Sequence, residues 1–85
     1  MKIFLHKIFL KKFSKLDDKV KQKFKERKNL FLTDTIHPLL NNHPVDKVYP
    51  GCRSINITGD YRAIFRHIGD DVEFINIGTH SQLYG

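Results

Sequence analysis

Eighty-five residues with 40% hydrophobic and 12% aromatic content suffice for one domain over residues 1–85, and exclude a disordered tail. A single cysteine excludes an intrachain disulfide, and no apolar run is long enough to cross a membrane, so we expect a cytoplasmic protein. The net charge is +6, with eleven Lys/Arg and three acids in residues 1–28 against four and six in residues 29–85. This asymmetry favours a polyanionic partner; a solvated lysine face is the alternative.

The N-terminal third has the patterns of a strand and two helices. Residues 2–6 form a short apolar run, which predicts a strand. Apolar residues then recur at helical spacing, namely Phe9, Phe13, Leu16, Val20 and Phe24. Asp17-Asp18 interrupts this stripe as an N-cap and first turn. We therefore expect two helices, about 8–15 and 18–33, folded back as a hairpin.

The rest of the chain alternates between breakers and strand-like segments. Residues 34–50 contain three prolines and predict an extended loop with one turn around residues 37–40. After Gly51, period-two patterns separated by short turns predict an antiparallel meander of three strands, namely 53–57, 61–66 and 72–77. The order β-α-α-β-β-β indicates an α+β domain in which helices cover one face of a small twisted sheet.

Two turns of this meander are predicted to meet at one edge of the sheet. The end of the first strand and the start of the second share that edge, and the third strand returns to it. Asp60, Tyr61 and His80 should therefore lie together. His43, on the proline-rich loop, is a further candidate because imidazole takes and gives protons near neutral pH.

These residue types suit cleavage of RNA through its own 2′-hydroxyl. That reaction requires a base for the hydroxyl, an acid for the leaving 5′-oxygen and positive charge for the phosphorane. Aromatic rings such as Tyr84 offer stacking faces for bases. Each candidate also has a purely structural interpretation: His80 as a surface or turn residue, Asp60 as a turn former, Arg53 and Arg62 as exposed strand residues, Tyr84 as a packing residue and His43 as a loop residue. The histidines and the cysteine show no metal-ligand spacing, so we expect neither a metal nor a cofactor.

The chain resembles the RelE/ParE toxin superfamily, on its YafQ-like branch, over essentially its whole length. The segments that carry the resemblance are Asn42-His43-Pro44, residues 51–57, residues 59–66 and Gly78-Thr79-His80-Ser81-Gln82-Leu83-Tyr84. The resemblance implies a microbial RNase-like fold and a type II toxin, an endoribonuclease that cleaves mRNA in the ribosomal A site and inhibits translation. It also implies three partners: the 30S ribosome, mRNA and a cognate acidic antitoxin.

The resemblance further implies roles for four catalytic side chains. His80 matches the branch's C-terminal catalytic histidine, the proton donor to the leaving oxygen, and Asp60 matches its catalytic aspartate. His43 matches the histidine at the head of the loop-to-sheet segment. Tyr84 stands where the wider superfamily has a functional tyrosine.

Five more residues are implied to contact RNA, and three of them depart from the branch's pattern. Arg62 falls where RelE-type members place a phosphate-binding arginine, and Arg53 lies at a common arginine position just before it. Lys47 replaces a glycine and would recover a phosphate contact, whereas Tyr61 replaces a tryptophan. Asn56 occupies the position of another catalytic histidine, and an amide does not transfer protons as imidazole does.

Two other functions remain open at the level of sequence. One is a ParE-like toxin without nuclease activity that binds a protein target such as gyrase. The other is a basic module that binds RNA or the ribosome without turnover. The Thr79-His80-Ser81 run and Tyr84 argue against the first of these.

Overall fold

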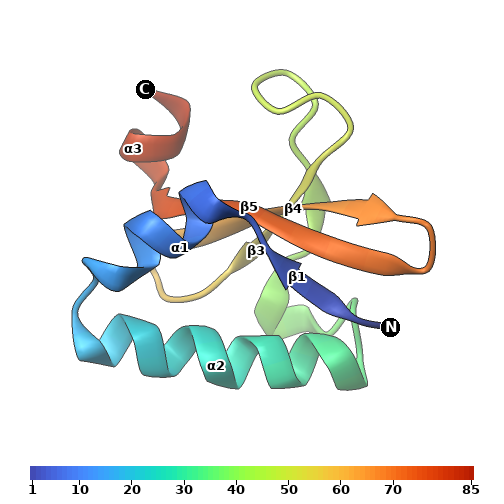
Figure 1. Cartoon of the computed structure of the whole chain (residues 1–85), viewed down its shortest axis with the longest axis horizontal. Coiled ribbons are helices and arrows are strands. Elements are labelled where there is room, and N and C mark those ends of the chain that lie inside the picture. Colours follow the sequence, from blue (N-terminus) through green and yellow to red (C-terminus); the bar gives the residue numbers. More distant parts are fainter.

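Five strands form one mixed sheet in the computed structural model, which describes residues 1–85 (Figure 1). The strands in spatial order are β1 (Ile3–Leu5), β5 (Asp71–Thr79), β4 (Tyr61–Ile68), β3 (Arg53–Asn56) and β2 (His43–Pro44). The three predicted meander strands are confirmed as β3, β4 and β5, and their pairings are antiparallel. β1 adds to the far side of β5 in parallel. The predicted α+β class is therefore confirmed.

The predicted helical hairpin is present as α1 (Lys7–Ser14) and α2 (Asp18–Thr33). Asp17 is the N-cap of α2, and its carboxylate accepts a hydrogen bond of 2.7 Å from the Lys19 amide. The Figure 1 view places α2 along one side of the sheet, with α1 between β1 and α2 in the chain. No helix in the structure is long and apolar enough to span a bilayer.

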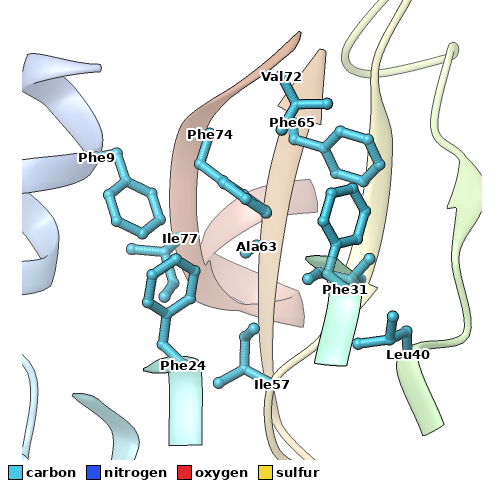
Figure 2. Close-up of a cluster of buried hydrophobic side chains, with 11 residues drawn as sticks. Phe9, Phe24, Phe31, Leu40, Ile57, Ala63, Phe65, Val72, Phe74 and Ile77 are labelled. Carbon is cyan, nitrogen blue, oxygen red and sulfur yellow. The ribbon is translucent and has the colours of Figure 1, made fainter. Parts of the chain in front are cut away.

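Aromatic rings fill the space between the two helices and the sheet (Figure 2). Phe74 on β5 is the hub of this core, because its ring centroid lies 5.5 to 6.0 Å from four other rings. These four come from both helices and from β4, namely Phe9, Phe24, Phe31 and Phe65. The helical stripe seen in the sequence is therefore the buried face of the hairpin.

The opposite face of the sheet carries a second, smaller cluster of buried residues: Cys52, Ile64 and Leu83. Leu83 belongs to a short C-terminal helix, α3 (His80–Tyr84), which the strand-and-helix pattern did not predict. The predicted coverage of one face by helices therefore holds for α1 and α2 but not for α3. The sequence did contain a signal for the start of α3, because Thr79-x-x-Gln82 has the spacing of a capping box.

The proline-rich segment is ordered around one short turn, as predicted. A 3-10 helix, η1 (Pro38–Leu40), begins after the N-cap His37 and ends at Asn41 in the left-handed conformation, with φ of 46°. Leu40 is fully buried in the main core, which anchors the segment. The chain then pairs briefly as β2 against β3, a contact too short to show as a sequence pattern.

Candidate active site

A groove of about 610 Å³ lies between α3 and the loop that joins β2 to β3. Pro44, Val45 and Val48 supply its apolar wall. Five of the nine residues proposed from the sequence line it, namely His43, Lys47, Arg62, His80 and Tyr84. Segments 40 residues apart in the chain therefore form one concave site with titratable, cationic and aromatic side chains.

Helix α3 positions His80 and Tyr84 on the wall of this groove. Thr79 and Gln82 form a capping box, in which Thr79 Oγ1 accepts from the Gln82 amide at 3.2 Å and Gln82 Oε1 accepts from the Thr79 amide at 2.9 Å. Residues four apart on a helix share a face. The imidazole of His80 accordingly packs on the ring of Tyr84, with centroids 4.8 Å apart.

His43 enters the groove from β2 with one ring nitrogen already engaged. Its Nδ1 lies 2.7 Å from the Asn41 carbonyl oxygen. A carbonyl oxygen only accepts hydrogen bonds, so in neutral His43 the proton sits on Nδ1 and the lone pair on Nε2. The free nitrogen of this imidazole is therefore a proton acceptor.

Two cationic side chains face the groove. Arg62 Nη1 donates to the carbonyl oxygens of Thr58, Gly59 and Tyr61 at 3.0 to 3.3 Å, which fixes the guanidinium against the β3–β4 turn. Its Nε and Nη2 make no hydrogen bond within the chain. Lys47 is exposed on the loop and has no ion-pair partner. Both groups are available to an anion in the groove.

Asp60 and Asn56 lie beside the groove without lining it. The predicted meeting of the β3–β4 turn with the end of β5 is confirmed, because Tyr61 pairs with Thr79 and the Asp60 carbonyl accepts from the His80 amide at 3.2 Å. The Asp60 residue is exposed and contacts α3 through its main chain. Asn56 is opposite Arg62 in the sheet, and its buried Oδ1 has no hydrogen-bond partner.

Arg53 and Tyr61 lie away from the groove. Arg53 donates from Nε to Asn42 Oδ1 at 2.7 Å and from Nη2 to the Asn42 carbonyl at 3.4 Å, so it braces the start of β2. Tyr61 packs against the main aromatic core and opens onto a separate cavity of about 390 Å³ beside Lys12 and Lys15. No three His, Cys, Asp or Glu side chains converge in the fold.

Comparison with known families decides the assignment. The model of a family described as the ParE toxin of the type II toxin-antitoxin system, parDE, matches residues 3–84. The chain belongs to the ParE toxin family. The expected resemblance to the RelE/ParE superfamily is confirmed. No curated protein sequence matches this toxin.

Solved structures share the fold of this ParE-family toxin. YafQ from Escherichia coli BL21(DE3) aligns with a TM-score of 0.79 and 24% identity, over 98% of this chain and 97% of that one. YafQ in the E. coli DinJ–YafQ toxin-antitoxin complex aligns with a TM-score of 0.76 and 24% identity, over 98% and 96%. The RelB–RelE antitoxin-toxin complex from Methanococcus jannaschii gives 0.75 and 17%, over 95% and 94%. At these identities the likeness establishes the fold.

The single cysteine of the toxin is a packing residue beneath the groove. Cys52 is 6% exposed and contacts the cluster formed with Ile64 and Leu83. Burial raises the pKa of its thiol, against an opposing influence of Arg66 and with a smaller rise from Asp46. A thiol whose pKa is raised stays protonated at neutral pH, so Cys52 is not a nucleophile of this site.

Gly78 is required for the capping box that begins α3. A Cβ at this position would lie 2.9 Å from Gln82 Oε1 and 3.3 Å from Gln82 Cβ. We expect Gly78→Ala to displace the Gln82 side chain, break its bond to the Thr79 amide and lower the free energy of unfolding by about 1 kcal/mol. Urea denaturation measures this loss. Gly59→Ala is the matched control, because a Cβ added at this position would have nothing within 4 Å. Equal denaturation midpoints for the two variants would contradict the role of Gly78.

Proposed function

We propose that this toxin is a ribosome-dependent endoribonuclease of the YafQ-like branch, which cleaves mRNA in the A site and thereby inhibits translation. The observation that carries the proposal is the placement of two histidines, His43 and His80, with two cationic side chains around one groove. Such a set supplies the base, the acid and the positive charge that RNA cleavage requires.

The proposed reaction gives one role to each of these groups. His43 Nε2 accepts the proton of the 2′-hydroxyl, whose oxygen attacks the adjacent phosphorus. His80 donates a proton to the departing 5′-oxygen, leaving a 2′,3′-cyclic phosphate and a 5′-hydroxyl. Arg62 and Lys47 stabilise the negative charge that builds on the phosphorane oxygens. These steps use side chains alone, without a metal or a cofactor.

The aromatic wall and the basic helices support binding of RNA. Tyr84 is half-buried on the groove wall and offers a stacking face for an unpaired base. Helices α1 and α2 carry eight lysines, of which only Lys23 is ion-paired, to Glu26 at 3.4 Å. Free lysine ammonium groups bind phosphates with release of counterions. We assign this surface to the ribosome, where ribosomal RNA presents a continuous polyanion.

An acidic antitoxin is the proposed protein partner. E. coli YafQ and the M. jannaschii RelE are each found in complexes with an antitoxin. The net charge of +6 suits an acidic segment that folds on binding. Such a segment would neutralise the lysines or occupy the groove.

A toxin without nuclease activity is the second candidate. The description of the matching family as the ParE toxin favours it. Asn56 also favours it, since an amide stands where the resemblance places a proton-transferring histidine. Under this alternative the toxin binds a protein target such as gyrase, and transcripts stay intact.

Primer extension on mRNA from cells that express the toxin separates the two candidates. The nuclease predicts cuts in frame with codons that disappear when translation is blocked. Intact transcripts in growth-arrested cells would sink the nuclease proposal and leave the protein-binding candidate.

A further inference from the structure

Tyr49, which no pattern in the sequence singled out, joins the two walls of the groove. Its hydroxyl donates to the carbonyl oxygen of Leu83 on α3 at 2.9 Å. The same hydroxyl accepts from Asn76 Nδ2 on β5 at 3.2 Å. One side chain thus links the loop to the C-terminal helix and to β5 of the sheet.

The loop that carries Tyr49 is held together by its own hydrogen bonds, so the position of Tyr49 determines the position of the rest of the loop. The Val45 amide donates to the Cys52 carbonyl at 3.1 Å, the Tyr49 amide to the Val45 carbonyl at 2.9 Å, and the Cys52 amide to the Tyr49 carbonyl at 3.0 Å. The Gly51 amide also donates to Asp46 Oδ1 at 2.9 Å. Fixing Tyr49 therefore fixes the groove wall that includes Lys47.

On the other side of the groove, α3 depends on few contacts. It has five residues, and Leu83 is its one buried side chain. The last carbonyl groups of a helix lack partners within that helix, and the Tyr49 hydroxyl satisfies one of them. The Tyr49 ring also meets the ring of Tyr84 edge-on, at 6.1 Å between centroids, and Tyr84 in turn packs on His80.

We propose that Tyr49 is a positioning residue that sets the width of the groove and holds the His80–Tyr84 pair in its reactive orientation. This inference rests on the proposed nuclease function. Tyr49 acts through Leu83 and Tyr84 and does not itself contact the RNA. Its hydroxyl is also anchored from the sheet, since Asn76 Oδ1 accepts from the Ile77 amide at 2.9 Å and so fixes the donor.

The test is Tyr49→Phe, which removes one oxygen and keeps the ring. We expect the NMR resonances of the His80 and Tyr84 rings to shift. We also expect the turnover number for ribosome-dependent cleavage to fall about tenfold, the scale of one lost hydrogen bond that selects the reactive conformer, with KM changed far less. Val20→Ala, which loosens the helix side of the core, is the control for loss of stability. It should leave both readouts unchanged at a temperature where both variants are folded.

Two results would overturn the inference. One is Tyr49→Phe with wild-type ring resonances and wild-type turnover. The other is Val20→Ala with the same changes as Tyr49→Phe, which would make the effect one of general stability. The NMR readout does not depend on activity. A toxin that cuts no RNA would refute the proposed function, while unmoved His80 and Tyr84 resonances would separately refute the positioning role.

Discussion

Replacing His80 with alanine is expected to lower the rate of mRNA cleavage at least ~10²-fold, the usual scale for loss of an acid–base group. The side chain is exposed in the groove, and the contacts that begin α3 are made by its main chain and by Thr79 and Gln82. The variant should therefore fold as the wild type does. Primer extension on mRNA from expressing cells, or cleavage on purified translating ribosomes, gives the measurement.

His67→Ala is the matched control for this change. His67 is an exposed histidine on β4 that does not line the groove. The His67→Ala variant should cleave mRNA at the wild-type rate. If His80→Ala retained that rate too, the proposed general acid would be wrong, and the groove would serve binding alone.

The largest loss of stability is expected for Phe74→Ala. The ring is fully buried and packs on four other aromatic rings (Figure 2). Truncation of a buried phenylalanine costs about 3 to 5 kcal/mol. Since domains have only ~5 to 15 kcal/mol in total, and small ones have little margin, a large fraction of the variant should be unfolded at 37 °C. Thermal denaturation followed by circular dichroism measures the change.

Phe4→Ala makes the same chemical change on the neighbouring strand. Phe4 pairs with Glu73, the residue before Phe74, but its side chain is 47% exposed. We expect a cost below about 1 kcal/mol. Similar melting temperatures for the two alanine variants would show that the aromatic cluster does not dominate stability.

The elements that sequence reasoning predicted are those with a long, regular apolar pattern. The stripe through Phe9 and Phe24 specifies the hairpin because burial of one helical face dominates its stability. β2 and α3 were not predicted, because a two-residue bridge and a five-residue helix depend on tertiary contacts. Leu83, for example, is buried by tertiary packing in a cluster with Ile64 and Cys52.

For the candidate site, the sequence predicted which edge of the sheet the residues share. It did not fully predict on which face of the sheet each side chain lies. Arg53 has the same period-two phase as Ile55, which belongs to the main core, so it points away from the groove. Arg62 has the opposite phase and reaches the groove. By residue type, Asp60 was as good a catalytic candidate as His80. Only the path of the main chain through the turn decides which of the two side chains faces the groove.

The position of β5 governs when this toxin acquires its shape during synthesis. β5 lies between β1 and β4, and residues Ile3 and Val72, far apart in the chain, are neighbours in the sheet. A nascent chain without β5 lacks the hub ring of Phe74, and without α3 it lacks a groove wall. Contacts of such long sequence separation form late, after the segments between them have emerged. An incomplete chain that ends before β5 therefore lacks both the complete core and the complete groove, so the proposed activity on the ribosome requires the last residues to have been made.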